Sequence, residues 1–230
     1  MKHLSLILII LILSCCPLHP AYAFFDKDIR LLTMRDGLAD NTIPCIYKDE
    51  DGFMWFGTDN GLSRYDGKTI QNFKPANTYV SIAAIVRLSD DFLGIVSDGY
   101  LYYFNRKRET FLPIHTESDT AIGVFNVLPA DDSSFWGISG NRLILCQWEI
   151  QQGKEEEKTA VRVRIQKTFQ LLEEKGEVFS SLCYHEKAGS GIWLTTNRGN
   201  LILFHPDTPG AYQKIPLTDG KTLQVTSILN

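Results

Sequence analysis

Residues 42–67 have the sequence TIPCIYKDEDGFMWFGTDNGLSRYDG, and the pattern of this stretch decides the fold class. Three short apolar segments are separated by two turn-forming segments, an acidic one that ends at Gly52 and a polar one that ends at Gly61. Short segments of β-branched and aromatic residues between such turns predict strands rather than helices. The stretch therefore predicts a small antiparallel sheet.

The same order of strands and turns returns three more times along the chain. Four antiparallel strands in every forty or so residues are typical of a β-propeller blade. One such sheet has two apolar faces, and neighbouring blades stacked around an axis bury both of them. We therefore expect an all-β fold, a β-propeller with about four blades at about 40–75, 79–113, 122–172 and 177–217 and a fifth that begins near 223.

Tryptophan marks the second strand of three of these repeats. Trp55, Trp136 and Trp193 align with one another, and Gly94 takes the same place in the second repeat. Because the position recurs, we expect these indoles to fill the space between blades rather than to stack on a sugar. The charged segment 151–158, QQGKEEEK, predicts a solvated hairpin tip inserted in the third repeat, with Trp148 exposed beside it.

The first 23 residues predict a secretory signal peptide. Lys2 precedes an apolar run at 4–13, and the small residues of Ala21-Tyr22-Ala23 form a cleavage site. The run is shorter than the roughly 20 residues that a membrane span needs. We therefore expect an exported, periplasmic mature chain, 24–230. A bacterial lipoprotein with lipid on Cys15 is the alternative, because the residues before Cys15 resemble a lipoprotein cleavage box.

Composition excludes several classes of protein. The 230 residues are 44% hydrophobic and carry a net charge of −4, which suits a folded core and argues against a nucleic-acid partner. The mature chain has an odd number of cysteines, Cys45, Cys146 and Cys183, so we expect small buried thiols rather than a disulfide framework. Zinc-ligand spacing is absent from the sequence, and we predict neither a metal site nor a cofactor.

Two features invite a chemical interpretation. The acidic run 49–52 could hold calcium, but a hairpin turn explains the same residues more simply. The mature histidines, His115, His185 and His205, have no carboxylate or nucleophile at a fixed spacing. We therefore predict no catalytic residue and no enzyme activity for this chain. A propeller lyase or glycosidase remains the less favoured alternative.

The first repeat carries the motif D-x-x-G-F-x-W-F-G-T-D-N-G-L-x-R-Y-D-G at 49–67, preceded by Asp36-Gly37-Leu38 and Asn41-Thr42-Ile43. It resembles the two-component regulator propeller repeat of the periplasmic sensor region in Bacteroidetes hybrid two-component systems. Members of that family carry two seven-bladed propellers, followed by a β-sandwich, a transmembrane helix, a histidine kinase, a receiver and a DNA-binding domain. The resemblance implies that this chain is an N-terminal fragment or a truncated gene product, an incomplete part of a seven-bladed propeller, with 29–33 as a leading strand that closes the ring.

Propeller geometry and the resemblance together place a ligand site. Turns between second and third strands open on one face, and carboxylates and amides there suit sugar hydroxyls, although turns favour the same residue types. The candidate residues are Asp59, Asn60, Asp98, Asn141, Asn197 and Arg198. The resemblance implies a module that senses an oligosaccharide to control glycan utilisation, with downstream propeller and kinase domains as partners and a homodimer left open. The alternatives are a protein-interaction scaffold or a truncated remnant.

Overall fold

The computed structural model describes residues 30–74, 80–117, 120–151, 160–184, 191–208 and 212–216. The predicted signal peptide, Cys15, the insertion tip after residue 151, His185 and the predicted fifth blade lie outside these residues. The chain divides into two compact units, Met1–Leu32 and Thr33–Asn230, and the architecture below is that of the second. Within the described ranges, none of the helices has both the length and the hydrophobicity that a membrane span requires.

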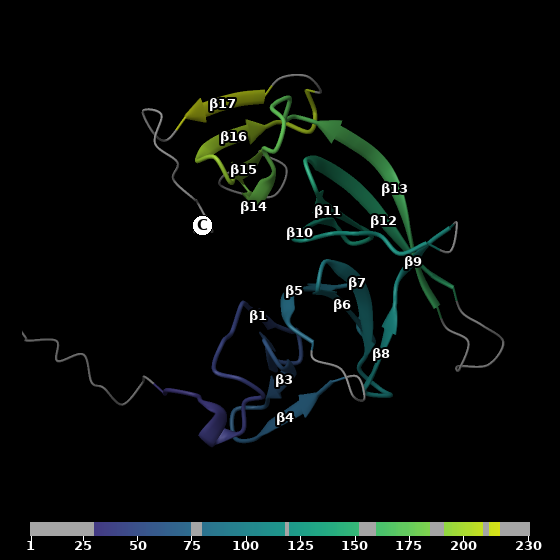
Figure 1. Ribbon diagram of the computed structural model, residues 1–230. Coiled ribbons are helices and arrows are strands. Elements are labelled where there is room, and N and C mark those ends of the chain that lie inside the picture. Colours follow the sequence, from purple (N-terminus) through teal and green to yellow (C-terminus); the bar gives the residue numbers. More distant parts are fainter. Residues whose placement is uncertain are drawn as a thin grey trace, which may run out of the picture. The chain divides into compact units, whose positions relative to one another are not determined.

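The first two sheets are four-stranded antiparallel meanders in which each strand pairs with the next along the chain (Figure 1). After the short 3-10 helix η2 (Met34–Asp36), the first sheet contains β1 (Cys45–Lys48), β2 (Met54–Thr58), β3 (Gly61–Tyr65) and β4 (Ile70–Phe73). The second contains β5 (Ile82–Arg87), β6 (Phe92–Ser97), β7 (Tyr100–Asn105) and β8 (Thr110–Pro113).

The third and fourth sheets repeat this arrangement. The third contains β10 (Val127–Asp131), β11 (Ser134–Ser139), β12 (Arg142–Gln151) and β13 (Ala160–Gln170), and β9 (His115–Thr116) joins β13 in parallel. The fourth contains β14 (Phe179–Tyr184), β15 (Ile192–Thr196), β16 (Asn200–Phe204) and β17 (Tyr212–Pro216). Four successive meanders confirm the predicted all-β, blade-like organisation.

Tryptophan side chains fill the space between neighbouring blades, as the sequence predicted. Trp55 on β2 is fully buried, and its ring centre lies 6.0 Å from that of Phe73 and 5.7 Å from that of Phe104 in the second blade. Trp136 on β11 lies 6.1 Å from Phe204 in the fourth blade. These contacts join the first blade to the second and the third to the fourth.

Trp193 departs from this pattern. It pairs with Leu203 in the register that Trp55 and Trp136 occupy in their own sheets, but it is only half-buried. Its neighbours Ile192 and Leu194 point to the opposite face and belong to the cluster shared with the third blade. Trp193 therefore faces away from the third blade, and because the predicted fifth blade lies outside the described residues, its position between blades stays a prediction.

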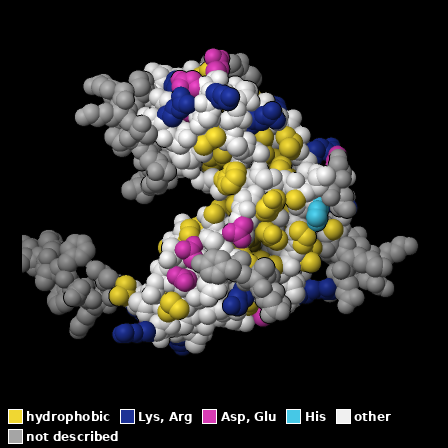
Figure 2. Space-filling model, in the orientation of Figure 1, with side chains coloured by type: hydrophobic (Ala, Val, Ile, Leu, Met, Phe, Trp, Pro, Cys, Tyr) yellow, Lys and Arg dark blue, Asp and Glu magenta, His cyan; other side chains and the backbone are white. Residues whose placement is uncertain are grey.

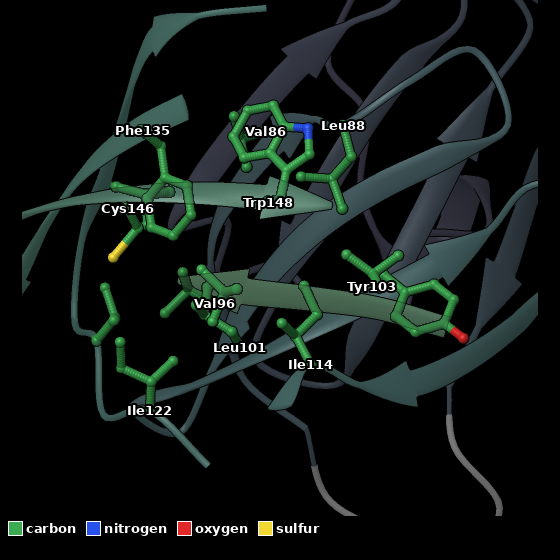
Figure 3. Packing of buried hydrophobic residues seen from close by; sticks show 14 of the residues in the cluster. Val86, Leu88, Val96, Leu101, Tyr103, Ile114, Ile122, Phe135, Cys146 and Trp148 are labelled. Carbon is green, nitrogen blue, oxygen red and sulfur yellow. The ribbon is translucent and has the colours of Figure 1, made fainter. Parts of the chain in front are cut away.

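The expectation that Trp148 is exposed is wrong. β12 and β13 pair from Arg142 opposite Gln170 to Gln151 opposite Ala160, so the hairpin extends past β11. On this extension Trp148 is only 6% exposed, and it stacks on Phe135 at 5.6 Å. Figure 3 shows both rings in the cluster that also contains residues of the second blade. The inserted hairpin thus packs onto the neighbouring blade.

The predicted leading strand is not formed where the structure describes it. The backbone from Arg30 to Thr33 has no strand hydrogen bonding. Thr33 instead caps η2, with its side chain accepting from the Arg35 amide while its own amide donates to Asp36. Leu38 follows and is buried, so the segment before β1 packs as an irregular cover rather than as a strand.

Candidate functional site

The candidate side chains of the first blade are held by neighbouring segments. Asp59 accepts a hydrogen bond from the Ser81 hydroxyl at 2.8 Å, just before β5. Asn60 donates its side-chain amide to the Ala39 carbonyl at 3.2 Å. Both side chains therefore stabilise the β2–β3 turn against the segments on either side of it.

The candidates of the fourth blade also bind within the chain. The side-chain oxygen of Asn197 accepts from the Val178 amide at 3.0 Å. The Arg198 guanidinium pairs with Glu174 and donates to the Lys175 carbonyl at 2.7 Å. These bonds fasten the β15–β16 turn to the connection that precedes β14.

Asp98 and Asn141 have a different environment, because both are exposed at their turns. Asp98 has φ of 49°, a left-handed conformation that Asp adopts more readily than most residues. Among the described residues, no hydrogen bond or ion pair joins any two of the six candidates. Arg198 is exposed too but is bound to Glu174 and Lys175. Asp98 and Asn141 are therefore the exposed candidates that no neighbouring segment holds, although the Ser97 hydroxyl donates to Asp98 at 3.5 Å.

A cavity of about 400 Å³ lies at the opposite ends of the strands, between the first and second blades. We call it the interblade cavity. The β1–β2, β5–β6 and β7–β8 turns contribute most of its lining, which is strongly charged. Its ionisable acids and bases are Asp49, Glu50, Asp51, Asp90, Asp91, Arg64, Arg87, Arg106 and Lys107.

Asp49 is the buried centre of this charged region. Its carboxylate accepts from the Phe53 amide at 2.8 Å, from the Trp55 indole nitrogen at 2.7 Å and from Arg106 at 2.8 Å. The Gly52 amide donates to the Asp49 carbonyl at 3.1 Å, and Gly52 has a positive φ of 90°. The acidic run therefore forms a hairpin turn, and the described residues contain no group of three side chains that could hold a metal.

Arg106 connects this turn to the second blade. It follows β7, and its guanidinium binds both Asp49 and Asp51, the latter at 2.7 Å. A second nitrogen donates to the Asp90 carbonyl at 2.7 Å. The sequence did not reveal this ion pair, because Asp49 and Arg106 are far apart in the chain. The repeat pattern of one blade does not indicate which turn residues of the next blade lie beside it.

Arg64 on β3 lies against aromatic rings. Its guanidinium carbon is 5.1 Å from the ring centre of Phe53, 5.5 Å from that of Trp55 and 5.3 Å from that of Phe73. A guanidinium placed over aromatic faces is attracted by the ring quadrupoles and loses freedom of movement. Arg64 thus reaches the interblade cavity in a fixed orientation.

A smaller cavity of about 240 Å³ lies at the same edge between the third and fourth blades. Trp136, Tyr184, Asp131 and Lys167 contribute to its lining. The Ser134 hydroxyl and the Ser133 amide hydrogen-bond to Asp131 and hold the pKa of its carboxyl below the usual value. The two cavities lie at equivalent places, each between neighbouring blades at this edge of the strands.

The fourth blade has a buried acid of its own. Glu177 is 1% exposed and accepts from Thr196 at 2.8 Å, Asn200 at 2.6 Å and Lys214 at 3.0 Å. Burial opposes its ionised form, but these hydrogen bonds outweigh burial, so the pKa of the carboxyl is lowered. Arg198 pairs with Glu174, and Lys214 pairs with the buried Glu177. Figure 2 shows basic and acidic side chains lying together on the surface of the molecule.

The match to a family model covers the turn that contains Asp49. Residues 37–60 match the two-component regulator propeller. This segment includes β1, β2 and the first candidate residues, Asp59 and Asn60. The sequence resemblance of the first repeat is therefore confirmed.

Solved structures resemble the chain over a longer span. Two structures of the extracellular domain of BT4673 from B. thetaiotaomicron, titled a putative one component and a putative hybrid two component system, are 20% identical to it with a TM-score of 0.59. They cover 82% of this chain, which spans 24% of theirs, and they show the same fold. The extracellular domain of BT3049 from the same organism is 14% identical, with a TM-score of 0.47, 80% of this chain covered and 31% of that chain. No curated protein matches the chain.

Proposed function

We propose that the chain is a non-enzymatic, ligand-sensing propeller module of a two-component signal transduction system. The observation that carries this proposal is the regulator-propeller match at 37–60, which includes β1 and β2 of the first of four consecutive blades. The predicted signal peptide supports a location outside the cytoplasm. The BT4673 domain, whose fold this chain shares, is an extracellular domain.

The proposed ligand is an oligosaccharide, bound at the edge formed by the turns between second and third strands. Asp98 and Asn141 are exposed there and offer a carboxylate and an amide, which together accept from and donate to sugar hydroxyls. Asp59, Asn60, Asn197 and Arg198 support the same edge through their bonds to neighbouring segments.

Signalling requires that the ligand prefers one arrangement of the protein. A ligand shifts an equilibrium only by the difference between its affinities for the two states. The proposed partners are therefore downstream propeller and kinase domains, which would transmit the state that the ligand favours.

Calorimetry of the full chain against a panel of neutral oligosaccharides tests the proposal. We expect one member to bind and the double variant Asp98→Ala/Asn141→Ala to lose about tenfold or more in affinity, because each side chain supplies hydrogen bonds to hydroxyls. Asp132→Ala, an exposed acid at the opposite edge, is the matched control and should bind as the wild type does. A folded wild-type chain that binds no member of the panel would contradict the proposal.

A further inference from the structure

We propose that the interblade cavity is a second ligand site, which takes a hydroxylated organic anion such as a sugar carboxylate or a sugar sulfate. The site lies at the strand ends opposite to the turns of Asp98 and Asn141. It is argued from the cavity alone, so its test is separate from that of the proposed function.

The charged side chains that line the cavity pair with one another, except that Arg64 pairs with an acid outside the lining. Arg106 lies 2.8 Å from Asp49 and 2.7 Å from Asp51. Lys107 lies 2.8 Å from Asp91. Each of these cations is therefore neutralised by an acid of the same lining.

Arg87 follows the same rule. Its guanidinium lies 2.7 Å from Asp90 and 3.5 Å from Glu50, and both acids line the cavity. All five acids of the lining thus have a basic partner within the lining. A free cation would gain little by entering, since it would compete with a guanidinium or ammonium group already in place.

Arg64 is the exception. The hydrogen-bond partner of its guanidinium is the neutral side-chain oxygen of Gln71, at 2.6 Å. Its carboxylate neighbour, Glu109, is 3.6 Å away and does not line the cavity. Glu109 also accepts from Gln71 at 3.1 Å. The Arg64 side chain, 22% exposed, is therefore the least neutralised cation that the cavity offers.

The arrangement of Arg64 favours an oxyanion. Three aromatic rings hold its guanidinium in place, so little side-chain entropy remains to be lost when an anion binds. A guanidinium presents parallel N–H donors that match the two oxygens of a carboxylate or sulfate. The geometry thus assigns the anionic group of the ligand to Arg64.

The remainder of the cavity suits hydroxyl groups. A volume of about 400 Å³ is enough for a sugar ring, because small-molecule pockets begin near about 300 Å³. Glu50 and Asp90 on the rim are exposed carboxylates that can accept from hydroxyls, and Tyr47 adds a phenol. The smaller cavity between the third and fourth blades has one basic residue in its lining, Lys167, which lacks the planar donor pair of Arg64.

Titration calorimetry of the full chain with D-glucuronate, glucose 6-sulfate and glucose tests the inference. We expect one or both anions to bind at least tenfold more tightly than glucose, and the stronger of the two identifies the source of the anionic group. Arg64→Gln should weaken anion binding by about 10- to 100-fold, as expected for the loss of a charge-assisted hydrogen bond. Arg142→Gln, an exposed arginine at the other edge, makes the same charge change and should have no effect.

A second variant separates binding from folding, because Arg64 also packs on aromatic rings. Glu109→Gln removes the competing carboxylate, keeps an oxygen for Gln71 and leaves the cavity lining intact. It should tighten anion binding by up to about fivefold, the range of an exposed ion pair. Equal affinity for glucose and glucuronate, no binding of either anion, unchanged binding in Arg64→Gln or weaker binding in Glu109→Gln would each overturn the inference.

Discussion

Asp49→Ala should be among the most destabilising single changes in the first blade. The carboxylate accepts from the indole N–H of Trp55, which is fully buried, and from Arg106 in the second blade. Leaving a buried donor without an acceptor costs about 1–3 kcal/mol, and losing a hydrogen bond to a charged group costs about 1.5–3 kcal/mol. The expected loss in the free energy of unfolding is therefore about 3–5 kcal/mol, or roughly 6–20 °C in Tm for a chain of this size.

Urea unfolding of three single variants and one double variant measures this effect. Asp51→Ala is the matched control, because Asp51 binds the same guanidinium at 2.7 Å but its side chain is 64% exposed. An exposed ion pair is worth about 0–1 kcal/mol, so this variant should be nearly as stable as the wild type. Arg106→Gln completes a double-mutant cycle with Asp49→Ala, and we expect a coupling of about 1–3 kcal/mol. An Asp49→Ala cost no larger than that of Asp51→Ala would refute the reasoning.

Two further predictions concern titration and thiol chemistry. The pKa of Glu177 is lowered in the folded protein, since hydrogen bonds from Asn200 and Lys214 outweigh its burial, so its stabilising contribution is present above its ordinary value of 4.5 and is lost as the pH falls through the folded pKa. Glu177→Gln should therefore lower Tm at pH 7 and flatten the fall of Tm below pH 4.5; a wild-type slope in the variant would contradict this. Burial raises the pKa of the Cys45 and Cys146 thiols to about 12, so both should resist iodoacetamide at pH 8 in the folded chain and react in urea, as peptide mass spectrometry would show; modification of either without unfolding would count against it.

The blades could be predicted from the sequence because the residues that define each strand and turn are close together in the chain and recur from one repeat to the next. Each strand is a short β-branched or aromatic segment between turn residues, and a four-strand unit depends mainly on its own turns. Trp55 and Trp136 could be placed between blades because an aromatic side chain that recurs at the same position in the second strand of several repeats must face the neighbouring unit. Trp148 could not be placed, because its burial depends on how far the inserted hairpin extends over the second blade.

The charged contacts at the blade edges could not be predicted from the sequence, because they join residues of different blades. Arg106 and Asp49 belong to turns of different blades, and each turn alone is explained by hairpin chemistry. The sequence identified Arg64 as part of the repeat motif. Its position over three aromatic rings and beside a cavity depends on the packing of its side chain, which the motif does not specify. Contacts between repeats therefore require coordinates even where the repeats themselves are obvious.

The two edges of the blades use their polar residues in different ways. At the turns between second and third strands, the side chains of Asp59, Asn60 and Asn197 form hydrogen bonds with adjacent segments of the chain. These bonds stabilise that edge but leave few side chains that could bind a ligand. At the opposite edge, the acids and bases pair across two blades around a cavity, so a bound molecule would contact both blades at once. Since a ligand biases only those parts that it contacts differently in two states, the interblade cavity is the better placed of the two to couple binding to the relative positions of blades.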